Sequence, residues 1–326
     1  MATLFVQIAP NAFAVAGETL RVSMTSAGVQ ATGHCYAPKL SADGRYVAFH
    51  SAAPDLVGGD TNGADDVFRK DMVAGDTVRV STDPSGGQAA GTSQSAAISS
   101  DGRYVAFESG AANLVAGDTN IATDVFRKDL VTGETLRVST DSTGAQSNAL
   151  SRGAAINSDG RYVLFRSGAT NLVAGDTGVA DDVFRKDLVT GETLRVSTDS
   201  SGNEANGLST HQAISPDGRY VAFMSAATNL VAGDTNIATD IFRKDLTTGE
   251  ILRCSTNAAG AQVLLGGFWP DVSWDGRFVA FASLAGDLVA GDTNLTQDIF
   301  RRELAAPAAF YFAEGTCRPG FDPYIT

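Results

Sequence analysis

The sequence predicts an all-β chain that forms a five-bladed β-propeller, and two observations lead to this prediction. A heptapeptide, Asp-Gly-Arg-(Tyr/Phe)-Val-(Ala/Leu)-Phe, occurs five times at a constant spacing of 58 residues, starting at Asp43, Asp101, Asp159, Asp217 and Asp275. Four of the repeats also contain four short runs of alternating large and small or polar residues, and the fifth contains the first three. A fixed period indicates similar units stacked in space, and four antiparallel strands in each unit make one blade of a propeller.

The repeat at residues 91–148 shows how each strand is predicted. Its four runs are rich in Val, Phe, Tyr and Thr or in small residues, and they cover 94–99, 103–109, 124–130 and 135–140. Period-two alternation in such residues is typical of strands. Turn-forming residues separate the runs, at Asp101-Gly102, Gly117-Asp118-Thr119-Asn120 and Thr132-Gly133-Glu134. Gly, Asp and Asn favour turns because they tolerate positive φ or bond their own backbone.

The two ends of the chain predict how the ring closes. The fourth strand begins at the same register in four repeats, at Gly75, Gly133, Gly191 and Gly249. A fifth copy would begin at residue 307, where the sequence is Pro-Ala-Ala, whereas residues 17–23 read Gly-Glu-Thr-Leu-Arg-Val-Ser and match the motif. We therefore expect residues 17–24 to pair with the strand at 298–304 and to close the ring, which removes an exposed edge. Residues 310–312, Phe-Tyr-Phe, are the competing candidate for this strand.

These registers predict one propeller domain and a tail. The domain spans 1–306, and the tail at 307–326 breaks the repeat. The predicted repeats are 33–90, 91–148, 149–206, 207–264 and 265–306, the last completed by 17–24.

The composition of the chain limits the kinds of partner that we expect the protein to bind. The chain has 24 basic and 37 acidic side chains and a net charge of −13, so this acidic protein repels phosphate backbones and anionic lipids. We expect no nucleic-acid partner and no membrane insertion, because no run reaches the roughly 18 apolar residues of a span. The three cysteines, Cys35, Cys254 and Cys317, lie at unrelated positions of the repeat and form no paired framework. The first basic residue is Arg21, so the charged start of a secretory signal is not visible.

The unit Ser-x-Asp-Gly-Arg-Tyr-Val-Ala-Phe, followed by Asp-Val-Phe-Arg-Lys-Asp-Leu and Leu-Arg-Val-Ser-Thr, resembles the WD40-like repeat of TolB-type β-propellers over residues 17–304. The Ser-Pro-Asp-Gly turn usual in that family occurs once, at 215–218. The resemblance implies a binding scaffold in the bacterial envelope or outside the cell. The tail at 312–322 is similar to a short segment that begins β-sandwich modules of large bacterial surface proteins, which implies a longer parent polypeptide.

A recurring Gly-Asp-Thr-Asn…Asp element is a candidate Ca²⁺ site, because oxygen ligands at alternate positions followed by a carboxylate suit a hard cation. The candidate ligands are Asp60, Asn62, Asp66, Asp118, Asn120, Asp124, Asp234, Asn236, Asp240, Asp292, Asn294 and Asp298. In the third repeat Gly178 replaces the Asn. The favoured alternative is a turn closed by hydrogen bonds of the Asp and Asn side chains to loop amides. No cofactor is required in either case.

Arginines recur beside these carboxylates, with Arg45, Arg69 and Arg79 as the first copies. A set repeated in each blade is compatible with a repeated ligand site. We favour ion pairs within or between blades that fix the stacking register.

Positions that differ among the repeats are the candidate ligand site. The first strand of the five blades opens with Tyr36-Ala37, Gln94-Ser95, Arg152-Gly153, Thr210-His211 and Phe268-Trp269, and the residues after the second-strand Phe are His50, Glu108, Arg166, Met224 and Ala282. The first strand is innermost in a propeller, so we expect a ligand at an axial mouth formed by Tyr36, Gln94, Arg152, His211, Phe268 and Trp269. The alternative is that these side chains only fill a narrow tunnel.

The sequence favours a non-catalytic binding or scaffolding propeller of a cell-surface or secreted bacterial protein, with a protein, peptide or glycan ligand. It contains no Gly-x-Ser-x-Gly, His-Glu-x-x-His or phosphate-binding Gly-x-x-x-x-Gly-Lys motif. One alternative is a glycan-processing enzyme with an axial carboxylate pocket, for which Glu108 and Asp271 are the candidates. A second alternative is a multivalent lectin with one site on each blade, which would use residues shared by all repeats.

Overall fold

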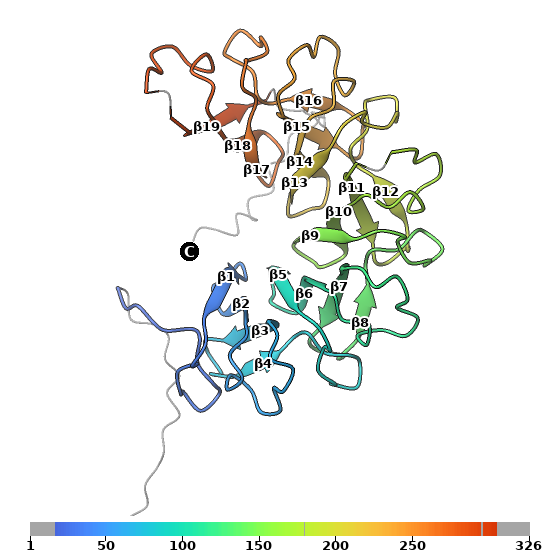
Figure 1. Ribbon diagram of the computed structural model, residues 1–326. Helices are drawn as coiled ribbons and strands as arrows, with labels where there is room; N and C mark the ends of the chain where they lie inside the picture. Colours follow the sequence, from blue (N-terminus) through green and yellow to red (C-terminus); the bar gives the residue numbers. More distant parts are fainter. Residues whose placement is uncertain (1–16, 179, 295, 305–326) are drawn as a thin grey trace, which may run out of the picture.

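The chain forms five antiparallel β-sheets around a common axis, as the sequence predicts (Figure 1). The computed structural model describes residues 17–178, 180–294 and 296–304. The first two blades contain β1 (Cys35–Leu40), β2 (Tyr46–Ser51), β3 (Asp66–Asp71), β4 (Thr77–Arg79), β5 (Ser93–Ile98), β6 (Tyr104–Ser109), β7 (Asp124–Asp129) and β8 (Thr135–Arg137). The other three contain β9 (Ser151–Ile156), β10 (Tyr162–Ser167), β11 (Asp182–Asp187), β12 (Thr193–Arg195), β13 (Ser209–Ile214), β14 (Tyr220–Ser225), β15 (Asp240–Asp245), β16 (Ile251–Arg253), β17 (Phe268–Val272), β18 (Phe278–Ser283) and β19 (Asp298–Glu303).

Each blade runs outward in sequence order, and β1, β5, β9, β13 and β17 lie nearest the axis (Figure 1). The fold is therefore an all-β, five-bladed propeller of the predicted four-stranded antiparallel blade type. The fourth strand is shorter than predicted. In blade two, β8 ends at Arg137 because the N–H of Val125, opposite Val138, donates to Ser139 Oγ at 3.2 Å and not to the carbonyl of Val138.

The core lies between neighbouring sheets. Within each blade the two inward-facing phenylalanines stack, as for Phe107 and Phe126, whose ring centroids are 5.8 Å apart. The segment after each fourth strand packs against the next blade, so that Val80 and Ala89 of blade one join Val105 and Phe107 of blade two in one buried cluster. Alternation along the strands thus places one apolar face of each sheet against its neighbour, as in face-to-face sheet packing.

Charged side chains connect successive blades. Arg127 Nη1 donates to Gly160 O of the next blade at 2.7 Å and lies over the Tyr104 ring, 4.4 Å from its centroid. Lys128 Nζ donates to Asp83 O of the preceding blade at 3.0 Å. A Cβ on Gly160 would lie 2.2 Å from the Tyr104 ring, and its φ is +74°, so this turn requires glycine. Arg69 and its copy Arg127 were expected to pair with carboxylates, and this is wrong because each donates to a turn carbonyl.

The other two recurrent arginines form the ion pairs that the sequence predicts. Arg45 Nη2 lies 2.8 Å from Asp71 Oδ2, and Arg79 lies between Asp60 and Asp66. Both pairs are within one blade. The Arg45 guanidinium lowers the pKa of Asp71 to about 2, because it bonds the ionised carboxylate.

The fifth blade has three strands among the described residues, in the order β17-β18-β19. The expected pairing of residues 17–24 with β19 is not among the hydrogen bonds of the part of the chain that the structure describes. Residues 17–24 instead lie against blade one, where Val22 packs with the cluster of Phe49 and Phe68 and Met24 forms a β-bridge to Gln30. The competing strand at 310–312 and the tail at 307–326 lie outside the described residues.

Candidate functional site

The two sets of variable residues meet at the inner strands of the blades. Each variable residue of the first strand is directly opposite the variable residue of the second strand, and the five pairs are Tyr36–His50, Gln94–Glu108, Arg152–Arg166, Thr210–Met224 and Phe268–Ala282. Directly opposed residues of antiparallel strands have Cβ atoms about 4.5–5.5 Å apart. We call these ten residues, with the residue that follows each first-strand member, the inner rim.

A β-bulge at the same position of every inner strand shapes this rim. The register of β5 shifts between Gln94 and Ala97, and the other four inner strands shift at the equivalent place. The bulged residue has positive φ in all five blades, in Ala37 (50°), Ser95 (54°), Gly153 (73°), His211 (51°) and Trp269 (50°). Left-handed backbone is unfavourable for residues with a Cβ, and such strained positions cluster at binding sites. Bulges also redirect side chains beside functional sites.

The rim offers both aromatic surface and polar groups. Trp269 is 60% exposed and Tyr36 is 50% exposed, while Phe268 and Arg152 are half-buried and Gln94 is exposed. Trp269 and Phe268 lie with ring centroids 6.1 Å apart, and Tyr36 stacks on His50 at 5.5 Å. Such rings supply apolar area with a polar edge, which suits sugar and peptide surfaces.

Hydrogen bonds fix the polar members of the rim. Glu108 Oε1 accepts the N–H of Gly153 from the next blade at 2.7 Å, and Gln212 Nε2 donates to the carbonyl of the same glycine. Thr210 Oγ1 lies 2.9 Å from His211 Nδ1. Burial and the Arg166 guanidinium lower the pKa of His211, which favours the neutral form of the ring.

The two candidate catalytic carboxylates have different surroundings. Glu108 is buried, and its carboxylate is engaged by the backbone of Gly153. Asp271 is exposed, and its Oδ1 accepts the N–H of Val272. Glu108 therefore joins β6 to β9, which is a role that stabilises the stacking of two blades.

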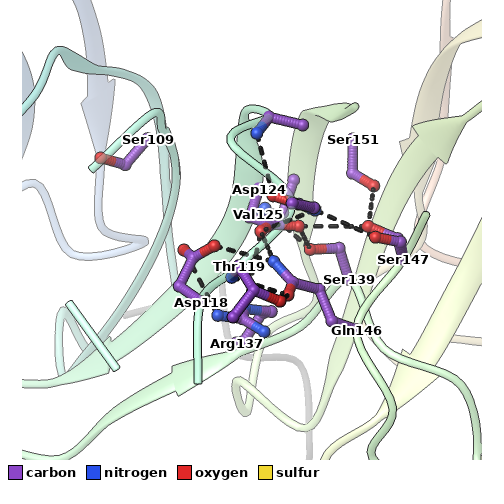
Figure 2. A network of polar contacts seen from close by, with 12 residues as sticks. Ser109, Asp118, Thr119, Asp124, Val125, Arg137, Ser139, Gln146, Ser147 and Ser151 are labelled. Carbon is purple, nitrogen blue, oxygen red and sulfur yellow. Dashed lines mark hydrogen bonds and ion pairs between the residues drawn. The ribbon is translucent and has the colours of Figure 1, made fainter. Parts of the chain in front are cut away.

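The recurring Asp-Thr-Asn loops lie farther from the axis, beside the third and fourth strands. Figure 2 shows the copy in blade two, where Asp118 and Asp124 flank Arg137 and Gln146. Gln146 Nε2 donates to Asp118 Oδ1 at 2.8 Å and to Asp124 Oδ2 at 2.9 Å, and Arg137 Nη2 lies 3.3 Å from Asp118 Oδ2. Ser139 Oγ donates to Asp124 Oδ1 at 2.6 Å. We call this set the outer network.

Hydrogen-bond donors already occupy the side-chain oxygens that the sequence predicts as candidate Ca²⁺ ligands. Asn120 Nδ2 donates to Ser147 O at 3.0 Å, and its Oδ1 accepts the N–H of Ala122 at 2.9 Å, which is the predicted turn alternative. Asp124 is fully buried, and burial raises its pKa. Equivalent bonds hold blade one through Asp60, Asn62 and Asp66 and blade four through Asp234, Asn236 and Asp240. Calcium binding at these loops stays a prediction.

Blade three departs from this pattern. Glu204 replaces the Gln, and Gly178 replaces the Asn, so three carboxylates surround Arg195: Asp176 at 2.8 Å, Asp182 at 3.3 Å and Glu204 at 3.2 Å. Among the described residues, this is the group of carboxylates close enough together to hold a metal ion, although Arg195 occupies its centre. Burial raises the pKa of Asp182 to about 7, and the other two carboxylates add to this effect. The motif itself shows Gly178 but does not include Glu204. A comparison of residues 88, 146, 204 and 262, which are Gln, Gln, Glu and Gln, would have identified it.

Radial blades with a variable inner rim define this chain as a β-propeller. Neither a family profile nor a curated protein matches it. Its fold is similar to that of TolB from Acinetobacter baumannii (TM-score 0.45, 16% identity, 78% of this chain and 53% of that chain). It is also similar to the β-propeller domain of the Trilobed protease from Pyrococcus furiosus (0.47, 12%, 83% and 69%) and to an oligogalacturonate lyase in complex with manganese (0.47, 15%, 82% and 65%).

The chain spans about half the length of the Acinetobacter protein. These neighbours include a lyase and a domain of a protease beside TolB, so the shared fold does not define an activity. Within the described residues, no helix has the length and apolar character needed to cross a membrane.

Proposed function

We propose that this chain is a non-catalytic binding module that takes a protein, peptide or glycan ligand at the inner rim. The observation that carries the proposal is the meeting of the two variable sets in cross-strand pairs on the innermost strands. A residue with a common structural role would be the same in every blade. Residues that differ at five equivalent positions, each followed by a strained residue of positive φ, can instead be chosen for contact with a ligand.

The chemistry of the rim supports this class of ligand. Exposed aromatic rings at Tyr36 and Trp269 provide stacking surfaces, and Gln94 and Arg152 provide hydrogen-bond donors. Binding sites of this kind combine apolar surface with a few placed polar groups. The shared carboxylates and arginines of the outer network are already bonded to one another, which supports the variable rim over a repeated site on each blade.

The proposal includes a place in the cell envelope or outside the cell, which the family resemblance implies, and no required cofactor. Fractionation of the source cells, with antibodies against the chain, tests the location. Recovery only from the cytosol would contradict it.

The binding proposal is tested with glycan and peptide arrays, each repeated with EDTA, followed by titration of the best ligand against two tryptophan variants. Trp269→Ala removes an exposed rim ring, and we expect a loss of at least tenfold in affinity, as for a contact residue at the centre of an interface. Trp274→Ala is the matched control, because Trp274 is 74% exposed on the turn between β17 and β18. Equal effects of the two substitutions would contradict the rim site, and unfolding of Trp269→Ala would mean that the ring fills space in the fold.

A further inference from the structure

Blade five and blade one each contain part of the residues that form a boundary between two successive blades. At the boundary between blades two and three, Arg137 and Gln146 bond Asp118 and Asp124, and Arg127 donates to Gly160 O. The arginine-to-glycine bond recurs at the other three formed boundaries. Arg79 of blade one and Arg253 of blade four also lie between the two equivalent carboxylates. They therefore define what a complete boundary contains.

Blade five carries one half. Asp292 and Asp298 lie at the register of Asp118 and Asp124, but the ion pairs of the described residues include no arginine partner for either of them. Arg301 lies at the register of Arg127, 4.6 Å over the Phe278 ring, and among the described residues no hydrogen bond of its guanidinium corresponds to that of Arg127. The outer edge of β19 is open, and Ile299 on it is 75% exposed.

Blade one carries the other half. Arg21 and Gln30 lie at the register of Arg137 and Gln146, and the hydrogen bond of Arg21 goes to Gln30 itself. Gly44 lies at the register of Gly160, yet a Cβ on Gly44 would meet nothing within 4 Å, whereas the Tyr104 ring fills this space beside Gly160. Gly44 has a φ of +71°, so its turn has the same backbone conformation as that of Gly160, but no aromatic ring of the described residues packs on it.

We propose that residues 17–31 bind the open edge of β19 in the same molecule and complete a fifth blade boundary. Arg21 and Gln30 then bond Asp292 and Asp298, and Arg301 donates to Gly44 O while Phe278 packs on that turn. Two open pockets beside β19, both lined by Val289 and Phe300, receive the segment. Asp292 and Asp298 line the pocket of ≈ 570 Å³, and the pocket of ≈ 430 Å³ lies between β19 and the segment after β16. This inference adds the side-chain partners to the backbone pairing that the sequence predicts.

The occupant belongs to the same chain because blade one already holds it in the required register. Lys70 Nζ donates to Thr25 O at 3.1 Å, and Thr77 N donates to Ser26 Oγ at 2.9 Å. The first of these bonds matches Lys128 with Asp83 O at the next boundary. A segment tethered in this way has a high effective concentration at β19, which favours closure within one molecule over pairing between copies.

Disulfide cross-linking tests the proposal. In the four complete blades the arginine of the third strand is paired with a fourth-strand residue, as in Arg127↔Leu136, so Leu20 should be opposite Arg301. Directly opposed strand residues have Cα separations within the range of disulfides. We expect the double variant Leu20→Cys, Arg301→Cys to form an intrachain cross-link under mild oxidant, seen as a faster monomer band on a non-reducing gel and as a linked peptide by mass spectrometry.

The background and control follow from the repeats. Native cysteines are replaced by the residues of sibling blades, Cys254→Val and Cys35→Ser, together with Cys317→Ser. The control variant Leu20→Cys, Glu303→Cys is two residues out of register and should cross-link at least tenfold more slowly. Covalent dimers in place of the monomer, equal rates for both variants, or no cross-link in a folded protein would overturn closure within one chain.

A stability comparison gives an independent test. Arg21→Gln should lower the Tm by an amount similar to Arg137→Gln, because both arginines then lie between two carboxylates. A folded Arg21→Gln variant with an unchanged Tm, beside a clear decrease for Arg137→Gln, would overturn the proposal.

Discussion

The inner rim and the outer network of the same blades differ in how their residues vary. In the outer network, blades one, two and four use the same residue types, with an arginine between two aspartates, and Arg137 of blade two is 8% exposed. On the inner rim, five equivalent cross-strand pairs are chemically different. The buried charges of the outer network therefore fix the geometry of each blade, and the side chains of the inner rim can differ between blades without changing that geometry.

The largest expected effect comes from breaking the outer network. Arg137→Gln leaves Asp118 and the fully buried Asp124 without their cation, and we expect the free energy of unfolding to fall by about 3–5 kcal/mol. Arg152→Gln on the inner rim is the matched control, because Arg152 has no ion pair among the described residues. Its expected loss is under about 1 kcal/mol. Urea unfolding measures both, and similar losses would mean that the two regions do not differ in this way.

The second prediction concerns pH and blade three. The pKa of Asp182 is about 7 in the folded state and near 3.8 unfolded, so between these values the folded state binds the extra proton. Stability from this group is present at low pH and is lost as the pH rises through 7. Glu204→Gln removes a negative charge and should lower the pKa of Asp182, so the Tm of the variant should fall less than that of the wild type between pH 5.5 and 8.

The titration of His211 changes the stability in the opposite direction between pH 5.5 and 8. Its folded pKa is lowered, so its contribution to stability rises as the pH passes through 6.5, and Glu204→Gln does not change it. The difference between variant and wild type therefore isolates blade three. Parallel Tm profiles of the two proteins would show that Glu204 does not act on Asp182.

The third prediction tests strain on the inner rim. Gly153→Ala places a Cβ at φ 73°, close to the side chain of Gln212, and should lower the free energy of unfolding by about 1 kcal/mol. Trp269→Ala changes the equivalent residue of blade five, and the backbone strain stays the same because both residues carry a Cβ. Its effect on the free energy of unfolding should therefore be smaller, under about 0.5 kcal/mol for an exposed side chain. Chemical denaturation of both variants checks this order, and the reverse order would place the ring of Trp269 in the core.

The smallest expected effect is that of calcium. Because Gln146, Asn120 and Arg137 already bond the loop carboxylates, we expect millimolar Ca²⁺ to leave the Tm unchanged. Binding to the native state alone would add about 2.7 kcal/mol at a hundredfold excess over Kd. A stabilisation of that size, reversed by EDTA, would show that the cation displaces the donors of the outer network.

Much of the fold was predictable because its determinants are local and repeated five times. Alternation and turn residues place strands such as β6 and β7 to within one residue. The fourth strand is shorter than predicted, because strand propensity does not show that the hydroxyl of Ser139 takes the N–H of Val125 from the strand pairing. Arg127 was assigned a carboxylate partner because charge alone does not reveal that a turn carbonyl of the next blade is closer.

The candidate site was predictable in part. Differences among repeats identified Tyr36 and Trp269, but the bulge that gives Trp269 its left-handed backbone has no sequence signal, since glycine occurs there only in Gly153. The pairing of Gln94 with Glu108 follows from strand register, which the bulge shifts. Neither the position of the inner rim in the structure nor the similarity to TolB identifies a ligand.

The bonds between blades also have a consequence for the order of folding. Lys128 and Thr82 are 46 residues apart, and Arg127 and Gly160 are 33 apart, so each boundary forms from nearby parts of the chain. Contacts of short sequence separation form quickly. The proposed closure would join Arg21 to Asp298 across almost the whole sequence, so it should be the last event, after the five blades have assembled. Until then β19 presents an unpaired edge, which makes the open arc the species most prone to aggregate.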